Sequence, residues 1–329
     1  MRVAVAGCGW SGSLLAYKLS QQGYAVEVYE RNKKPTAVCA CGIPASFFIE
    51  LAKSCSLNPE DYICQKGDLV IALGKKRFHL KAGNLCTFNK QKFMEDLINQ
   101  TLATFHFGRK FALDKAEEYN LIIDATGTRE LLGRLPQDQF FVTYQVKAKF
   151  ANPPYHDFYF QLSQNPDERY LWYFPLSEKE AYVGFGSKNG QSARQHVESF
   201  LKHHKAQPLQ RQAKILRLNP PQESLPFSIG KILGVGNSIG AITSMGEGNA
   251  PSAMTVQILT ENLYNPQRYT MQVLKKLGWL KHDHAAYKAW NRKQKMRTLY
   301  HMLRILKTYR ERFKLTLPVA MLWWLLVLL

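Results

Sequence analysis

The segment RVAVAGCGWSGSLLAYKLSQQGYAVEVYE, residues 2–30, constrains the fold more than any other part of the sequence. Residues 2–6 are Arg2 followed by alternating valine and alanine, as in a buried parallel strand. A helical pattern of apolar residues follows and ends near Gly23, and a second strand, 26–29, runs into Glu30. A strand, a helix and a strand within about thirty residues predict a βαβ unit and therefore an α/β fold.

A glycine-rich turn of the pattern G-x-G-x-x-G connects the first strand to the helix. The first glycine permits a tight turn, the second lets the backbone approach a pyrophosphate, and the third lets the helix pack closely on the sheet. The helix N-terminus offers unpaired N–H groups to phosphates. The residues of this turn that we assign to cofactor binding are Gly7, Gly9, Trp10, Ser11 and Gly12. The alternative is a structural βαβ unit whose glycines are incidental.

Glu30 stands at the end of the second strand, 18 residues after Gly12. A carboxylate at this place accepts hydrogen bonds from the ribose hydroxyls and repels a 2′-phosphate. Together with its neighbour Arg31, it predicts a site for the adenosine of FAD or NAD and not of NADP.

Two later segments predict further contacts with such a cofactor. NLIIDATGT, residues 120–128, is a strand that ends in a small-residue turn, and residues 230–263 contain a strand, a glycine-rich loop and a helix that starts near Gly248. Glycine permits close approach of the backbone to a ligand, and a helix N-terminus again favours an anion or a carbonyl oxygen. The predicted contacts are Ala125, Thr126, Gly127, Gly236, Asn237, Gly246, Glu247, Gly248 and Asn249.

The middle of the chain adds an aromatic motif. Tyr170, Trp172, Phe174 and Pro175 form the pattern Tyr-x-Trp-x-Phe-Pro, which is followed by a turn and by YVGFGS at 182–187. Period-two spacing places the three aromatic rings on one face of a strand. That face is either the wall of an apolar pocket or an ordinary core face.

These motifs together resemble the FAD-containing geranylgeranyl reductase family, which is related to the aromatic hydroxylases. A Cys41-Gly42 pair soon after the second strand adds to the resemblance, which spans roughly residues 1–265. It implies a Rossmann-type FAD-binding domain, similar to that of glutathione reductase and the aromatic hydroxylases, with an inserted antiparallel-sheet substrate domain. It also implies that Cys41 and Gly42 lie near the flavin ring and that Tyr170, Trp172 and Phe174 line the path of a polyprenyl chain.

Two positions depart from the family pattern. Asn237 stands where the family usually has an aspartate, and an amide can still hydrogen-bond a hydroxyl. Lys90, in KQKF, stands where the family usually has an arginine, so the charge is kept and the fork geometry is lost. Cys41 is a candidate proton donor or positioning residue, or alternatively a packed thiol or a disulfide partner.

The excess of basic over acidic residues indicates an anionic partner. The formal net charge is +19, and residues 281–314 carry eleven Lys and Arg against Asp283 and Glu311. The apolar stretch 315–329 is too short to span a bilayer, for which about 20 residues are needed. We expect a cytoplasmic protein held at an anionic membrane surface by this region; the alternative is a C-terminal helix that packs on the protein itself. No nucleic-acid-binding motif is present, and we expect no bound metal.

The predicted organisation has three parts. The FAD-binding domain comprises 1–75, 86–135 and 226–265, the substrate domain 76–85 and 136–225, and the basic helices with the apolar tail 266–329. The leading hypothesis is an FAD-dependent oxidoreductase that reduces carbon–carbon double bonds of prenyl chains, with NAD(P)H or an electron-donor protein as the reductant. The alternatives are a flavin monooxygenase or other flavin oxidoreductase with an apolar substrate, and a flavoprotein that binds lipid without turnover.

Overall fold

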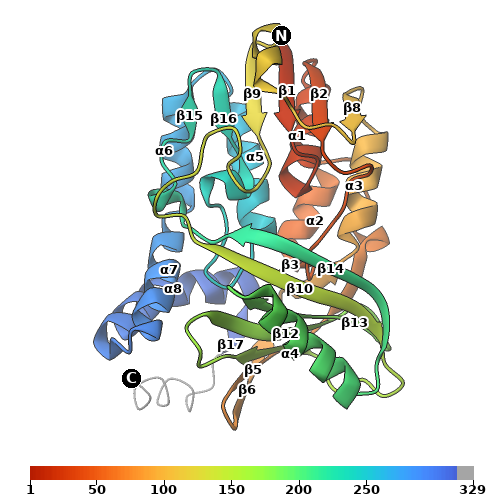
Figure 1. Ribbon diagram of the computed structural model, residues 1–329, viewed down its shortest axis with the longest axis vertical. Helices are drawn as coiled ribbons and strands as arrows, with labels where there is room; N and C mark the ends of the chain where they lie inside the picture. Colours follow the sequence, from red (N-terminus) through yellow and green to blue (C-terminus); the bar gives the residue numbers. More distant parts are fainter. Residues whose placement is uncertain (317–329) are drawn as a thin grey trace.

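The computed structural model describes residues 1–316. These residues form a six-stranded sheet, an eight-stranded sheet and a three-stranded sheet, with helices around them. The six-stranded sheet lies in the upper half of Figure 1, and the eight-stranded sheet lies in the lower half.

The six-stranded sheet is built on the predicted βαβ unit. β1 pairs in parallel with β2 on one side and with β9 on the other. The parallel pairings continue outward to β8 and β16, and only the short edge strand β15 is antiparallel. In sheet order the strands are β15 (Ser228–Ile229), β16 (Ile232–Gly234), β9 (Leu121–Asp124), β1 (Arg2–Ala6), β2 (Ala25–Glu30) and β8 (Thr104–Phe107).

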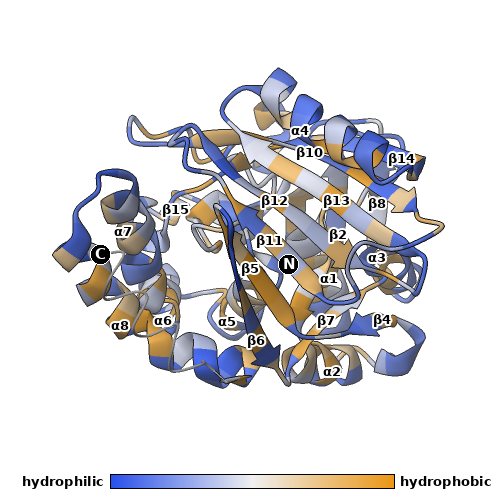
Figure 2. Ribbon diagram, turned by 90° about the horizontal axis from the view of Figure 1, so that it is seen from below, coloured by the Kyte–Doolittle hydropathy of each residue, from blue (hydrophilic) through white to orange (hydrophobic). Residues whose placement is uncertain are grey.

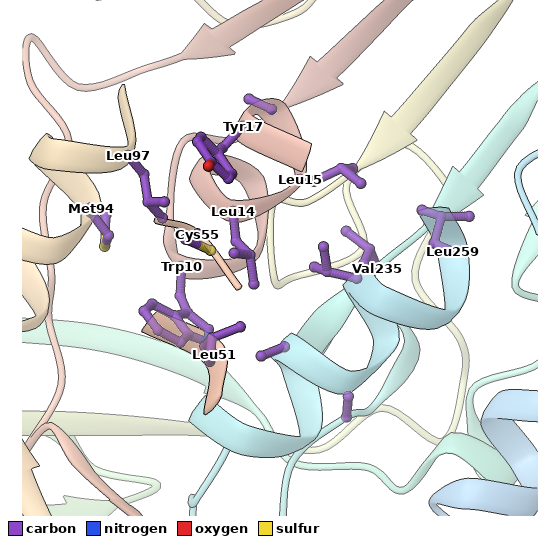
Figure 3. Close-up of a cluster of buried hydrophobic side chains, with 14 of the residues drawn as sticks. Trp10, Leu14, Leu15, Tyr17, Leu51, Cys55, Met94, Leu97, Val235 and Leu259 are labelled. Carbon is purple, nitrogen blue, oxygen red and sulfur yellow. The ribbon is translucent and has the colours of Figure 1, made fainter. Parts of the chain in front are cut away.

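The main hydrophobic core lies between this sheet and the helices that cover it. The helices that contribute to this core are α1 (Trp10–Gln21), α2 (Ala45–Lys53), α3 (Lys90–Asn99), α5 (Asn249–Glu261), α6 (Pro266–Lys276) and α7 (Trp279–Asn291). Two further helices, α4 (Gly190–His203) and α8 (Lys295–Phe313), lie outside it. Figure 3 shows side chains of α1, such as Leu14 and Leu15, with Leu97 of α3 and Leu259 of α5 around them. This packing joins α1 to α5, which begins more than 200 residues later in the sequence.

The eight-stranded sheet contains the aromatic motif. The predicted hairpin is confirmed, because β12 pairs antiparallel with β13. α4 covers one face of this sheet, where Leu171 and Tyr173 pack, and Figure 2 shows α4 lying across β10 and β13. In sheet order the strands are β14 (Gln207–Arg217), β10 (Phe140–Lys149), β13 (Glu180–Ser187), β12 (Glu168–Pro175), β11 (Phe158–Leu162), β5 (Leu69–Leu73), β6 (Lys76–Ala82) and β17 (Leu315–Thr316).

The predicted boundary at residue 75 needs correction. β5 was assigned to the FAD-binding domain, but it pairs with β6 and β11 in the eight-stranded sheet. The reason is that 69–73 and 76–82 form a hairpin, which cannot be split between two sheets. A small sheet of β3 (Gly42–Pro44), β7 (Leu85–Phe88) and β4 (Ile63–Lys66) lies between the two parts.

The C-terminal helices return to the body of the protein. α7 packs on α8, the Asn84 side chain donates to the carbonyl of Arg312, and β17 pairs with β6. No helix within residues 1–316 combines the length and the apolar character needed to cross a membrane. Most of the predicted apolar anchor, 317–329, lies outside the described residues, so membrane association stays a prediction.

Candidate functional site

A single large cavity extends along the junction of the two main sheets. Its volume is about 1170 Å³, which exceeds the roughly 300–1,000 Å³ of a typical small-molecule site. All predicted site residues line it except Gly12 and Gly236. The cavity joins the glycine turn after β1 to the aromatic face of β12, so it has room for a cofactor and a second molecule.

The glycine turn is shaped by close packing at two positions and is open at the third. Gly7 has φ +101°, and a Cβ there would lie 2.7 Å from the carbonyl oxygen of Ala125. A Cβ at Gly12 would lie 1.9 Å from the carbonyl oxygen of Gly7. A Cβ at Gly9 would meet nothing within 4 Å. Gly9 therefore leaves open space on the cavity side, as a pyrophosphate requires, at the uncapped N-terminus of α1.

The carboxylate of Glu30 is fixed at the wall of this cavity. It accepts hydrogen bonds from the backbone N–H of Cys8 at 2.9 Å and of Asn32 at 2.9 Å. Because β1 and β2 are adjacent, the carboxylate stands beside the glycine turn. Arg31 also lines the cavity, but its side chain is well exposed and lies 3.5 Å from Glu130.

Asp124 holds the Ala125-Thr126-Gly127 turn, and sequence reasoning missed it. Its carboxylate accepts hydrogen bonds from the hydroxyls of Thr126 and Ser238 and from the backbone N–H groups of Thr126, Leu131 and Leu132. These five donors offset part of the hydration that the buried carboxylate loses. The available signal was an aspartate two residues before a threonine, which is typical of a side-chain-stabilised turn.

The second glycine-rich loop packs directly on the first. A Cβ at Gly236 would lie 2.2 Å from the Ser11 hydroxyl, so Gly236 brings this loop against α1 and does not line the cavity. The neighbouring Asn237 does line it, and its side-chain oxygen accepts a hydrogen bond from Ser252 at 3.2 Å.

Glu247 connects this loop to α8. Its carboxylate lies 2.6 Å from Arg312, and its backbone N–H donates to Thr243. Gly246 has φ +81°, and the Tyr170 hydroxyl donates to the carbonyl of Met245. The polar groups of Glu247 therefore hold the loop and the first turn of α5, where its carboxylate accepts the backbone N–H of Ala250 at 3.3 Å. Gly248 and Asn249, at the start of α5, line the cavity.

Asn249 is the centre of a polar cluster that includes Lys90, Cys39 and Cys41. The Lys90 ammonium donates to its side-chain oxygen at 2.8 Å and lies 5.2 Å above the Trp10 ring. The Asn249 amide donates to the carbonyl of Gly42 at 2.9 Å and to the Cys39 sulfur at 3.4 Å. Trp10 donates its indole N–H to the carbonyl of Asn249, so Trp10 and Lys90 position Asn249.

Cys39 and Cys41 differ in character, and the sequence singled out the less accessible one. Cys41 is 3 % exposed, and its thiol donates to the carbonyl of Cys39. The Cys39 sulfur accepts the backbone N–H of Cys41 at 3.2 Å and lines the cavity. Hydrogen bonding from the Cys41 thiol, with the Lys90 ammonium nearby, lowers the pKa of Cys39 well below its ordinary value, and the same pairing raises the pKa of Cys41.

Cys39 is therefore expected to be the reactive thiol. Because its pKa is lowered, its thiolate persists as the pH falls below the roughly 8.5 of a free cysteine, and iodoacetamide should alkylate it faster than any other thiol at pH 7. Cys39→Ser should abolish this fast phase. Cys41→Ala removes one donor to the thiolate and should move the pH profile of alkylation upward. A fast phase that survives in Cys39→Ser would contradict the assignment.

The aromatic motif forms one wall of the cavity, as the alternation predicts. The Tyr170 and Trp172 ring centroids are 5.6 Å apart, and Phe158 lies 5.0 Å from Phe174. Glycines make room for these rings: a Cβ at Gly184 would lie 2.1 Å from Trp172, and one at Gly42 would lie 2.5 Å from Phe174.

α8 forms the opposite side of this part of the cavity. The lining residues from α8 are Leu299, Met302, Leu303, Ile305, Leu306, Tyr309 and Phe313. Met296, one turn before Leu299 on the same helix, is exposed. Within residues 1–316, no group of three or more His, Cys, Asp and Glu side chains is placed to bind a metal ion.

Comparisons with known proteins agree with this architecture. No family model matches the chain. An uncharacterized protein of Methanocaldococcus jannaschii is 22% identical over 96% of each chain. A geranylgeranyl bacteriochlorophyll reductase-like protein from Thermoplasma acidophilum is 17% identical, with a TM-score of 0.68 over 92% of this chain and 89% of that one. A probable FAD-dependent monooxygenase from Pseudomonas aeruginosa is 13% identical, with a TM-score of 0.65 over 92% of this chain and 99% of that one. The chain therefore has the fold shared by these FAD-dependent monooxygenase and geranylgeranyl reductase-like structures.

Proposed function

We propose that the chain is an FAD-dependent oxidoreductase that reduces carbon–carbon double bonds in the prenyl chain of a lipid. The observation that carries this proposal is the single cavity that joins the glycine turn after β1 to the aromatic wall of β12. One end is polar and presents two helix N-termini, and the other is lined by aromatic and aliphatic side chains. A dinucleotide and a long apolar chain suit these two ends.

The residues present fit FAD. Gly9 leaves space for the pyrophosphate, Glu30 presents its carboxylate where ribose hydroxyls bind, and Asn237 and Asn249 stand at the cavity wall after the second glycine-rich loop. When bound, the flavin supplies the hydride chemistry, and the protein supplies position and exclusion of water.

The chain's own side chains contribute three functions beyond holding the cofactor. Tyr170, Trp172 and Phe174 orient an apolar chain along β12. The apolar side of α8 lines the same cavity and adds aliphatic contacts for such a chain. Cys41 keeps its proton on Sγ at neutral pH because its pKa is raised, while the neighbouring Cys39 lines the cavity. The thiol pair therefore places an exchangeable proton beside the cavity, as the reduction of a double bond requires.

The reductant is proposed to be NAD(P)H that docks transiently, or an electron-donor protein. The observation behind this proposal is that the sequence contains a single G-x-G-x-x-G turn, so a second nucleotide has no dedicated site of this type.

Anaerobic reoxidation tests the proposed activity. The purified protein is loaded with FAD and bleached with dithionite, and a geranylgeranyl lipid is then added without oxygen. We expect the flavin absorbance to return and the lipid mass to increase by two hydrogens per reduced bond. No reoxidation with any prenyl lipid would overturn the prenyl assignment. Product formation that depends on oxygen would point to a monooxygenase instead, and a protein that takes up no FAD would overturn the flavoprotein assignment.

A further inference from the structure

Arg169 is a buried cation on the cavity wall that lacks a carboxylate partner. The residue is 7 % exposed and lines the cavity. Its Nε and Nη1 atoms are buried and have no hydrogen-bond partner among the described residues. A buried charge without a partner is costly, and such groups are normally paired or bind a ligand.

A β-bulge brings Arg169 into the cavity. β12 and β13 are in register from Leu171 to Pro175, but Glu168 pairs with Ser187, so one extra residue is inserted on β12 between Glu168 and Leu171. Without it, strict alternation would turn Arg169 toward α4, together with Leu171. With it, Arg169 and Tyr170 both line the cavity, and Glu168 contacts Ser192 of α4. Bulges that redirect a side chain are frequent next to functional sites.

Two aromatic rings hold the guanidinium in place. The Cζ atom of Arg169 lies 3.9 Å from the Phe141 ring centroid and 3.9 Å from the Tyr287 ring centroid. Stacking of this kind partly offsets the loss of hydration and leaves the planar edge of the guanidinium for hydrogen bonds. Gly186 gives the side chain its room, because a Cβ there would lie 3.3 Å from the Arg169 Cβ.

The carboxylate of Asp283, which faces Arg169, is already bonded to other donors. Asp283 of α7 interacts electrostatically with Arg169, but it accepts the backbone N–H of Ser244 at 2.5 Å and the Tyr309 hydroxyl at 2.8 Å. Burial lowers the pKa of Arg169, although arginine keeps its charge in proteins. An anion at this edge of the guanidinium would therefore give Arg169 a partner that the described residues do not supply.

We propose that Arg169 binds the anionic end of the chain molecule, a phosphate or a carboxylate, while the apolar part lies along Tyr170, Trp172 and Phe174. Arginine suits this role because its fork matches the oxygens of phosphate and carboxylate. Phe174 is five positions after Arg169 along the strand, which corresponds to about 16 Å. The anionic end is therefore held at one end of the wall, and Gly42, which packs on Phe174, lies at the other. The identity of the chain as a prenyl group rests on the proposed function; the anion site does not.

Binding to the oxidised, FAD-loaded protein tests the proposal without turnover. Farnesyl phosphate and farnesol share one chain and differ in the charged end, and inorganic phosphate supplies the charge alone. Affinities are measured from quenching of tryptophan fluorescence. We expect the wild type to bind farnesyl phosphate at least ten-fold more tightly than farnesol, and inorganic phosphate far more weakly than either. Inorganic phosphate that binds as tightly as farnesyl phosphate would overturn the proposal, since the site would then serve free phosphate.

Arg169→Gln should reduce the preference for farnesyl phosphate to less than about three-fold, with farnesol affinity within two-fold of the wild type. The matched control is Arg77→Gln, which removes an exposed arginine from β6 of the same sheet, lining a different hollow, and should keep the full preference. Arg169→Lys keeps the charge and loses the fork, so it should retain part of the preference. It also serves as the test variant if Arg169→Gln does not fold.

The remaining outcomes distinguish failure of the Arg169 anion site from failure of the prenyl reductase proposal. Equal affinities of the wild type for farnesyl phosphate and farnesol, or an undiminished preference in Arg169→Gln and Arg169→Lys, would overturn the anion site and leave the prenyl reductase proposal standing. If neither prenyl compound binds, the prenyl proposal fails, and palmitate and hexadecanol take their place in the same comparison. A preference for palmitate that depends on Arg169 would support the anion site, and its absence would overturn it.

Discussion

A Gly9→Ala variant is expected to fold with wild-type stability and to bind FAD at least ten-fold more weakly. The backbone of Gly9 has φ −80° and ψ −164°, which alanine adopts freely, and the added Cβ meets no protein atom within 4 Å. The methyl group would instead occupy the space where the backbone is open to the cavity. The thermal unfolding midpoint of the apoprotein and the quenching of FAD fluorescence on titration measure the two effects.

Gly12→Ala is the matched control, and it is expected to lower the thermal unfolding midpoint of the apoprotein. Its Cβ would lie 1.9 Å from the carbonyl oxygen of Gly7, so the turn or α1 must shift, and overpacking of this kind costs about 1–3 kcal/mol. The apoprotein should therefore be destabilised before any cofactor is added. Wild-type FAD affinity in Gly9→Ala would show that the turn after β1 is structural only.

A Gly184→Ala variant is expected to lose about 1–3 kcal/mol of unfolding free energy. Gly184 pairs with Trp172 across the hairpin, and a Cβ on it would lie 2.1 Å from the indole ring. The indole is 7 % exposed and packs against neighbours that restrict its movement. Equilibrium unfolding in urea, followed by circular dichroism, measures the loss.

A double-mutant cycle tests whether the clash at Gly184 is with the Trp172 ring. Trp172→Ala alone should leave FAD affinity unchanged and lower prenyl turnover more than ten-fold, because it removes the middle of the aromatic wall. In the Trp172→Ala background, Gly184→Ala should cost little or nothing, since the clash is gone. Additive losses in the double variant would show that Gly184 and Trp172 act independently, and loss of FAD from Trp172→Ala would return the motif to plain core packing.

Local patterns in the sequence were sufficient for the elements that carry the site. β1, α1 and β2 lie where the spacing predicted them, and α5 starts at Asn249 directly after Gly248. The alternation of Tyr170, Trp172 and Phe174 predicted their common face, because strand geometry fixes the side of each residue without reference to the rest of the fold.

Contacts between distant segments could not be predicted in this way. The sequence singled out Cys41 and gave no sign of Cys39, because the lowered pKa of Cys39 depends on its hydrogen bond with Cys41 together with Lys90 and Asn249, which are distant in sequence. β5 was predicted in the FAD-binding domain but lies in the eight-stranded sheet. The sequence of a single strand does not show which strand it pairs with. Helical spacing in α8 showed an apolar side but could not show that this side faces the cavity of the same molecule.

The sequence by itself therefore determined the turn after β1, the carboxylate at the end of β2 and the aromatic face of β12, since each depends on neighbours within a few residues. Only the tertiary structure decided that these features share one cavity, that α8 covers it, and that a bulge turns Arg169 into it. The order of residues gives no sign of this bulge. It exists because β12 has two residues between Glu168 and Leu171, whereas β13 has one residue between their partners, Phe185 and Ser187. That count is set by pairing between strands, and pairing is a property of the folded chain.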